Sequence, residues 1–193
     1  MLNTRALNDL LSSNSDERLC KCWYLMSPNG TILASTQPSD TKHQRKQAAV
    51  AALYWQEHLD GGEIDHVSIQ QQGGLGRDLH TLSVESATSN LIICRLQHEL
   101  LLVLEGGVPP RKRTFAPRVT AQDPSGELLL PASTAESSLS GSLSSFADTN
   151  RIASSSSVLA LHRKKLDAMA AAILADLERT GFKMPRDGEE GLF

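Results

Sequence analysis

Residues 24–34 read Tyr-Leu-Met-Ser-Pro-Asn-Gly-Thr-Ile-Leu-Ala, a turn sequence between two apolar segments. Two apolar, strand-like runs, 21–27 and 31–35, flank Pro28-Asn29-Gly30. Asn and Gly tolerate positive φ, which a tight turn between antiparallel strands requires. The sequence therefore predicts a β-hairpin here.

Helices are expected on both sides of this hairpin. Before it, Leu7, Leu10 and Leu11 are spaced for one face of a short helix over 4–12. After it, a helix begins at Ser39 or Asp40 and ends near Gly61-Gly62. Its second half, 48–55, is apolar on nearly every side, whereas a surface helix needs only one apolar stripe. That extra apolar face indicates a partner.

Three more strands and a last helix complete the expected order. The runs 79–85, 91–97 and 99–105 form an antiparallel meander, in which 79–85 alternates like an edge strand and the other two suit central strands covered by helices. Helical spacing resumes from Leu159 to Leu177, and Gly181 is placed to end that helix. The predicted fold is α/β of the α+β type, a five-stranded antiparallel sheet with flanking helices in the order α-β-β-α-β-β-β-α.

The segment 106–156 differs in composition from the rest of the chain. Between Ser133 and Ser157, 11 of 25 residues are serine, which offers little apolar surface to offset the entropy of ordering. We predict four parts: a core over 1–105, a disordered Ser/Pro-rich insertion over 106–156, a helix over 157–181 that completes the domain, and a flexible tail over 182–193.

Composition excludes several function classes. The chain has 193 residues and a net charge of −3, from 19 Lys plus Arg against 22 Asp plus Glu, so it lacks the basic excess of a nucleic-acid binder. Its longest apolar runs fall far short of the roughly 20 residues that span a bilayer, so no direct membrane insertion is expected. Three cysteines cannot form a disulfide framework, and no apolar leader or lipidation motif is seen. We therefore expect any localisation to a membrane to depend on a partner protein.

No catalytic, metal or cofactor site is predicted. The glycine-rich 73–78 lacks the Lys and the following helix of a phosphate-binding loop. Neither the Cys20-Lys-Cys22 pair nor the histidines, among them His43, His58, His66 and His80, have zinc-ligand spacing. No nucleophile elbow or acid–base pair is seen. The basic tracts 111–113 and 163–165 are expected to be solvated faces rather than lipid contacts.

Four stretches together resemble the roadblock family: the opening Met1-Leu2 to Ala6-Leu7 with Leu10-Leu-Ser12, the hairpin 24–34, Ala51-Ala-Leu-Tyr-Trp55, and Ser89-Asn-Leu-Ile-Ile-Cys94. Within the family, the pattern is most like the roadblock subunits of Ragulator-type complexes and their fungal EGO-type counterparts. The resemblance covers about 1–105 and 158–181, and the long serine-rich insertion departs from it.

The resemblance implies a noncatalytic scaffold that pairs with a second roadblock subunit through the long helix and the edge strand. By position, the partner-binding residues would be Ala48, Ala51, Ala52 and Trp55 on the helix, and Leu79, Thr81, Ser83 and Glu85 on the strand. The heterodimer would join a lipidated adaptor at the cytosolic face of the late endosome, lysosome or vacuole membrane, and hold Rag-type GTPases for TOR nutrient signalling.

Two other functions remain open on the same fold. One is a homodimeric activator of a small GTPase, which commonly supplies an arginine to the transferring phosphate; Arg77 and Arg95 are the candidates. The other is a dynein-associated cargo adaptor. Fold resemblance alone does not separate these uses.

Overall fold

The computed structural model describes residues 2–36, 41–60, 79–97, 99–109, 115–129 and 146–184. It contains the helices α1 (Thr4–Ser13), α2 (Thr41–Asp60) and α3 (Phe146–Thr180), and the strands β1 (Cys20–Met26), β2 (Ile32–Ser35), β3 (Thr81–Glu85), β4 (Ser89–Gln97), β5 (Leu100–Gly107), β6 (Arg118–Gln122) and β7 (Leu128–Leu129).

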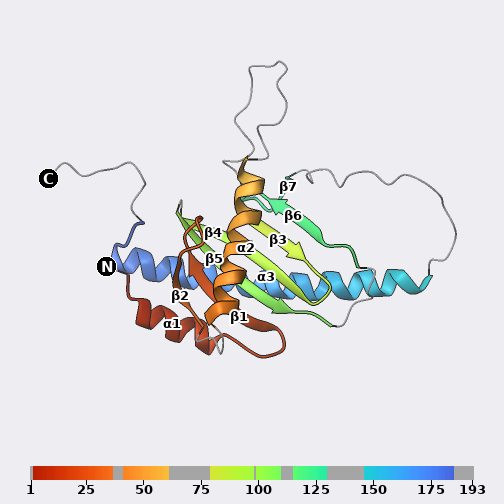
Figure 1. The fold of residues 1–193 in the computed structure, drawn as a ribbon, viewed down its shortest axis with the longest axis horizontal. Coiled ribbons are helices and arrows are strands. Elements are labelled where there is room, and N and C mark those ends of the chain that lie inside the picture. The colour runs from red at the N-terminus through yellow and green to blue at the C-terminus, as the bar shows by residue number, and fades with distance from the viewer. Residues whose placement is uncertain are drawn as a thin grey trace, which may run out of the picture.

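All the described strands form one antiparallel sheet in the order β2-β1-β5-β4-β3-β6-β7. Figure 1 shows α2 crossing one face of this sheet and α3 running behind the other. The predicted fold class, an antiparallel sheet with flanking helices, is confirmed. The predicted element order is also found, with β6 and β7 added before the last helix.

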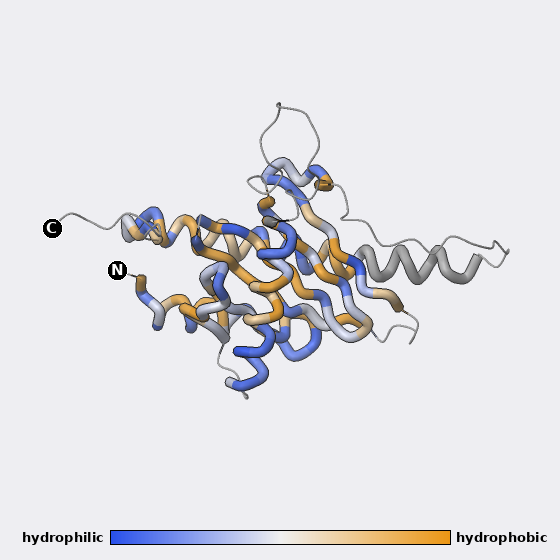
Figure 2. The backbone as a smooth tube through the Cα atoms, turned by 45° about the horizontal axis from the view of Figure 1, so that its top comes forward, coloured by the Kyte–Doolittle hydropathy of each residue, from blue (hydrophilic) through white to orange (hydrophobic). Residues whose placement is uncertain are grey.

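The sheet separates two apolar cores. Alternate side chains of the central strands point to opposite faces, so Leu101 and Val103 of β5 lie under α2, whereas Leu102 and Leu104 lie under α1 and α3. Figure 2 shows the hydrophobic tube segments concentrated in these strands. The prediction that β4 and β5 are central strands covered on both faces is therefore correct.

The β1–β2 hairpin follows the Asn-Gly prediction. The Ser27 N–H donates to the Thr31 carbonyl at 2.9 Å, and the Asn29 side-chain oxygen accepts the Thr31 N–H at 3.1 Å. Gly30 has φ +87°, a conformation that side-chain-bearing residues rarely adopt. The turn thus requires glycine at this position.

Helix α1 is capped and anchored by two asparagines. The Asn3 side chain accepts the Ala6 N–H at 3.1 Å. One turn later, the Asn8 side chain accepts the Ser35 N–H of β2 at 2.8 Å. This second bond occupies an outward-facing donor on the free edge of β2, which would otherwise be open to another strand.

Helix α3 is fastened to the sheet through a buried histidine. The His162 side chain is 0% exposed, and its Nδ1 lies 3.3 Å from the side-chain nitrogen of Asn90 in β4. Its ring lies so close to Gly106 of β5 that a Cβ added there would meet the ring at 2.4 Å. Gly106 therefore lets α3 approach the sheet.

The end of α3 matches its prediction, and its beginning does not. Gly181 follows the helix with φ +62°, and the Phe182 N–H donates to the Leu177 carbonyl at 2.9 Å. However, α3 begins at Phe146, eleven residues before the predicted start at 157. The helix backbone thus continues through Ser154–Ser157, although the serine-rich composition there favours the insertion.

The insertion and tail predictions need further correction. Residues 106–107 end β5, and 118–122 and 128–129 are strands, so parts of 106–156 have regular structure. In the predicted tail, Phe182 and Met184 pack against the α1/α3 core. The Gln97 side chain donates to the Phe182 carbonyl at 3.3 Å and accepts the Met184 N–H at 3.1 Å. Residues 110–114, 130–145 and 185–193 lie outside the described part of the chain.

None of the helices in the described residues is both long enough and apolar enough to pass through a membrane.

Candidate interaction surface

The helix residues predicted to contact a partner face this chain's own sheet. The side chains of Ala48, Ala51, Ala52 and Trp55 are each 6% exposed or less and belong to the core between α2 and the sheet. A side chain covered within its own subunit leaves no surface for another. The helix face assigned from the sequence is therefore corrected: the surface that α2 offers lies on its opposite side.

Small residues on the inner side of α2 set how closely it lies to the hairpin. A Cβ placed on Gly30 would lie 3.4 Å from the Ala52 Cβ and 3.6 Å from the Ala48 carbonyl oxygen. On the same flank, the Gln56 side chain donates to the Pro28 carbonyl at 3.5 Å. The alanines thus serve the packing of α2 onto the β1–β2 turn.

The opposite side of α2 carries an apolar strip, which we call the outer strip: Ala49, Val50, Leu53 and Tyr54. Leu53 is 66% exposed, Ala49 is exposed, and Val50 and Tyr54 are half-buried. Exposed large apolar side chains with apolar neighbours mark interaction sites more often than isolated ones do. The sequence-based inference that α2 is apolar on more than one side is thus correct, although the residues differ.

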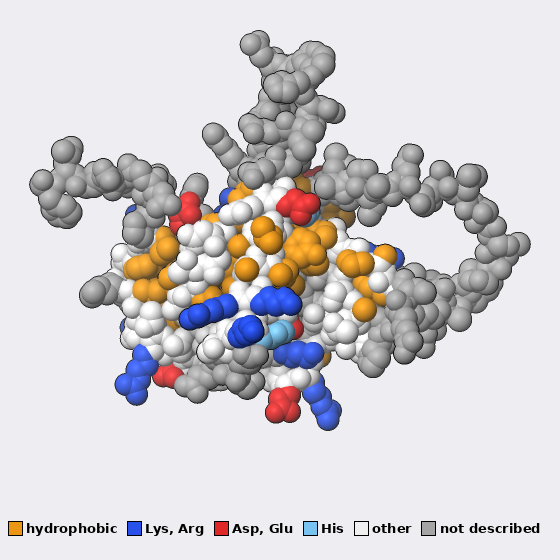
Figure 3. Space-filling model, in the orientation of Figure 1, with side chains coloured by type: hydrophobic (Ala, Val, Ile, Leu, Met, Phe, Trp, Pro, Cys, Tyr) orange, Lys and Arg blue, Asp and Glu red, His pale blue; other side chains and the backbone are white. Residues whose placement is uncertain are grey.

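The apolar surface continues from α2 onto the sheet. Tyr54, Val119 of β6 and Leu129 of β7 are partly buried and pack against the same core. Figure 3 shows the hydrophobic groups spreading from the helix towards the β3 side of this face. Seven strands at about 4.8 Å spacing make a sheet roughly 29 Å wide, whereas a helix is only about 10 Å across. The central-strand side chains on this face, such as Leu82 and Ile93, are nonetheless buried. The sheet therefore adds only the half-buried Val119 and Leu129 to the apolar surface beside α2.

Charge is distributed unevenly along α2. Its first two turns expose Lys42, His43, Arg45 and Lys46, and its last turns expose Glu57. In Figure 3, Lys and Arg gather over the lower part of this face, and hydrophobic groups lie above them. An interface on α2 would thus have an apolar centre and a basic margin, in keeping with the apolar core and polar rim of protein–protein interfaces.

The predicted edge strand is not an edge. β3 pairs with β4 on one side and with β6 on the other, and Thr81–Glu85 align with Gln122–Arg118 in continuous register. Among the four predicted contact residues, Leu79, Thr81 and Ser83 are buried and Glu85 is half-buried. The prediction failed because β6, from the supposed insertion, covers the backbone groups that a partner strand would use.

The side chain of Ser83 has a partner within the chain. Arg163 of α3 donates to the Ser83 Oγ from Nε at 3.2 Å and from its terminal nitrogen at 3.1 Å. In the same basic tract, Lys165 pairs with Asp16 at 3.5 Å. The tract 163–165 thus helps attach α3 to the sheet and to the segment after α1.

A signal for β6 and β7 was present in the sequence. Val119-Thr-Ala121 is strand-like, and Asp123-Pro-Ser-Gly126 has turn composition. In the structure, the Asp123 carboxylate accepts the Glu127 N–H at 2.8 Å, and Gly126 has φ +83°. The serine-rich stretch that follows obscured this hairpin.

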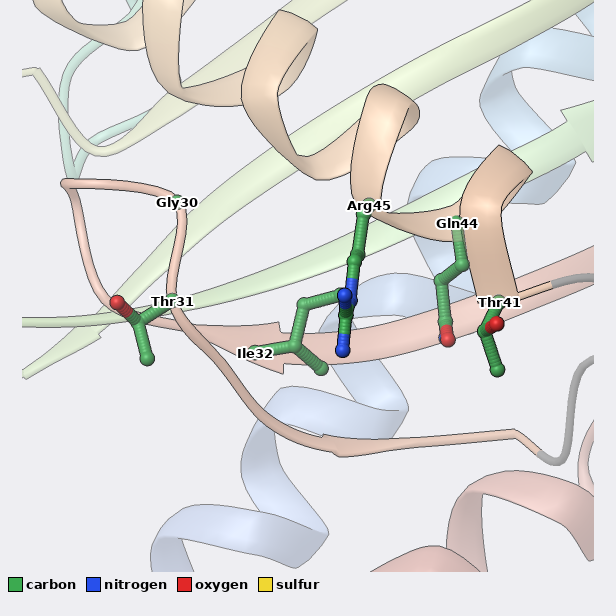
Figure 4. A pocket seen from close by; sticks show the side chains of 6 residues that line it. All are labelled: Gly30, Thr31, Ile32, Thr41, Gln44 and Arg45. Carbon is green, nitrogen blue, oxygen red and sulfur yellow. The ribbon is translucent and has the colours of Figure 1, made fainter.

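A cavity of about 450 Å³ lies between the N-terminal turn of α2 and the β1–β2 turn. Figure 4 shows the residues that line it: Thr41, Gln44 and Arg45 come from α2, and Gly30, Thr31 and Ile32 from the hairpin. Arg45 is the charged group among them, and no carboxylate or imidazole is found among these described lining residues. The lining thus lacks the paired groups of acid–base catalysis.

The surroundings of the described cysteines and of His80 do not favour a nucleophile or a metal site. Burial raises the pKa of the Cys94 thiol to about 11, and it also raises the pKa of Cys22, whereas a nucleophilic thiol needs a lowered pKa. Burial, with Arg95 nearby, lowers the pKa of His80, whose Nδ1 lies 3.1 Å from the Thr81 hydroxyl. Across the described ranges, no group of His, Cys, Asp and Glu is arranged to hold a metal ion.

Several candidates named from the sequence fall outside the described residues: the glycine-rich 73–78 with Arg77, His66, and the basic tract 111–113. Arg95, the other arginine considered for GTPase activation, is half-buried in β4.

Comparison with known proteins gives no match to a family model and none to a curated protein. Among solved structures, the chain is similar to a Roadblock/LC7 domain from Streptomyces avermitilis, with 19% identity and a TM-score of 0.38 over 50% of this chain and 72% of that one. It is also similar to MglB from Myxococcus xanthus, with 12% identity and a TM-score of 0.46 over 96% and 97% of the two chains. The gliding protein MglB from Thermus thermophilus is similar too, with 12% identity and a TM-score of 0.38 over 55% of this chain and 76% of that one.

Proposed function

We propose that this chain is a noncatalytic scaffold subunit of the roadblock type, which binds a second roadblock subunit through the outer strip of α2. In the finer form of the proposal, the pair belongs to a Ragulator- or EGO-type assembly. A separate lipidated adaptor anchors that assembly at the late endosome, lysosome or vacuole, where it recruits Rag-type GTPases for TOR signalling.

The observation that carries the proposal is the exposure of Leu53 in the centre of the outer strip. Burying one leucine side chain contributes roughly 1.5–3 kcal/mol, and the neighbouring Ala49, Val50 and Tyr54 enlarge the apolar area. A partner helix lying on this strip would cover Leu53 and part of the adjacent sheet. The basic first turns of α2 would favour a partner with acidic groups at the corresponding margin.

The test is affinity purification of the tagged full-length chain from native cells, comparing wild type with Leu53→Arg. A guanidinium at the centre of an apolar interface leaves an unpaired charge on association, so the variant should lose its partners while remaining folded. Leu161→Arg is the matched control, because Leu161 is also an exposed leucine, 40% exposed, but lies on α3.

The proteins lost from Leu53→Arg and kept by Leu161→Arg identify the role. A small roadblock subunit together with a lipidated adaptor and Rag-type GTPases supports the scaffold. A small GTPase whose GTP hydrolysis the chain accelerates would instead identify the chain as a GTPase activator. Dynein intermediate chain among the lost partners would identify it as a cargo adaptor. An unchanged set of partners in both variants would show that the outer strip is not the interface.

A further inference from the structure

The cavity between α2 and the β1–β2 hairpin is lined by polar side chains that the proposed scaffold role does not use. Thr41, Gln44 and Arg45 are three and four positions apart, so they lie on one side of α2. Figure 4 shows all three extending from the helix towards β2. The cavity volume of about 450 Å³ is within the range of pockets that hold small ligands. The cavity is therefore large enough to admit a group from another molecule.

Gln44 is a buried polar side chain in this cavity. It is 7% exposed, and its amide nitrogen makes one long contact, 4.0 Å, with the sulfur of Cys22. Sulfur is a weak acceptor, and within the described ranges the amide oxygen and the second N–H have no hydrogen-bond partner. Buried polar groups nearly always have such partners. A ligand in the cavity would supply the missing one.

Arg45 gives the cavity a positive charge. The ion pairs found among the described residues, Lys165 with Asp16 and Arg179 with Asp176, do not include it. The first turn of α2 contains no acidic residue, although the positive end of a helix dipole favours negative charge there. Arg45 is also the charged group among the described lining residues. The cavity thus matches a ligand with one negative charge.

From these three observations we propose that the cavity binds a side-chain carboxylate on an acidic segment of a partner protein. A guanidinium binds a carboxylate through two parallel N–H···O bonds, and the Thr41 hydroxyl and the Gln44 amide donate to the lone pairs that Arg45 leaves free. Ile32 gives the wall an apolar part that suits the methylene groups of Asp or Glu. A phosphate group, with its charge near −2, would exceed the charge of Arg45. The outer strip is not used, so the inference is independent of the proposed function.

Titration of the full-length chain with a short N-acetylated oligoglutamate amide, followed by NMR, tests the site. Saturable shifts are expected at the side-chain amide signals of Gln44 and at the Nε–H signal of Arg45, because both groups donate to the carboxylate. An oligoglutamine peptide of the same length has no carboxylate and should leave these signals unchanged. Inorganic phosphate, added in a separate titration, distinguishes a carboxylate site from a phosphate site.

Three variants separate the cavity from a general attraction to the basic turns of α2. Arg45→Met should weaken peptide binding at least about tenfold, because it removes a charge-assisted bidentate contact. Lys46→Met is the matched control, because it removes the same charge from the next residue, which is exposed and does not line the cavity; it should weaken binding less than about threefold. Gln44→Leu keeps the net charge and nearly the same volume, and should weaken binding about three- to tenfold through the lost hydrogen bond.

The proposal is overturned if the peptide gives no saturable shifts at Gln44 and Arg45, or if Gln44→Leu binds it as well as the wild type. Equal weakening by Lys46→Met and Arg45→Met would also overturn it, because the attraction would then belong to the whole basic surface. Tighter binding of inorganic phosphate at the same signals would overturn the assignment to a carboxylate. Leu53→Arg leaves the cavity residues intact and should bind the peptide like the wild type, so the two proposals fail separately.

Discussion

Ala51 and Leu53 are two positions apart on α2, yet one is 0% and the other 66% exposed. We predict that Ala51→Arg destabilises the free chain by about 3–5 kcal/mol, because a guanidinium would be forced into the packed core without a charged partner. Leu53→Arg should change the stability by less than about 0.5 kcal/mol, as exposed substitutions usually do. Urea denaturation of the two variants measures the difference, and equal destabilisation would contradict the placement of α2.

At position 162, burial is the main reason that the histidine pKa lies below its ordinary value. The unfolded chain therefore binds a proton more readily than the folded one, and stability rises with pH. The contribution of His162 is fully present above about pH 6.5, the ordinary pKa of histidine, and is lost as the pH falls below it. His80, whose pKa is also lowered by burial, acts in the same direction.

We expect the free energy of unfolding to drop between pH 7 and pH 5, and to drop less in His162→Gln. His43→Gln, a change of the same type at an exposed position of α2, is the control for the substitution itself. Denaturation at a series of pH values measures the slopes. A His162→Gln slope equal to that of wild type would show that this imidazole does not sense pH.

Among the elements, α3 and β5 meet where the His162 ring lies against Gly106. Gly106→Ala should destabilise the chain by about 1–3 kcal/mol, because the added methyl group overpacks a close contact. The same substitution should be nearly neutral when His162 is already alanine, since the ring is then absent. A double-mutant cycle by thermal unfolding measures this coupling, and additive effects would place the strain elsewhere.

Some elements could be predicted from the sequence and others could not. The hairpin at Asn29-Gly30 and the central strands were predicted because turn chemistry and continuous apolar runs are local signals. The inner face of α2 was misassigned because several of its sides are apolar, and only the sheet below decides which one is buried. β6 was missed because the serine-rich stretch that follows obscured its local signal, and because its pairing with β3 joins residues more than thirty positions apart.

For the molecule as a whole, the segment 106–156 must be divided. Deleting 134–139, which leaves ten residues between β7 and α3, should change the free energy of unfolding by less than about 1 kcal/mol, because the closure of a flexible loop depends only weakly on its length. Joining Gly107 directly to Ser156 should destabilise the chain more, since it also removes β6 and β7. Equal stability of the two deletions in urea would show that the hairpin contributes nothing to the fold.

The strands of the sheet are synthesised well before the last helix that covers them. The sheet has its first five strands once β5 ends at Gly107, but α3, which covers Ile92, Leu102 and Leu104, ends only at Thr180, 73 residues later. At about 5–20 residues per second, a ribosome needs about 4–15 s to make them. For that time α1 alone covers this apolar face of the nascent chain, and we expect the part left open to bind chaperones that act at the ribosome before the last helix arrives.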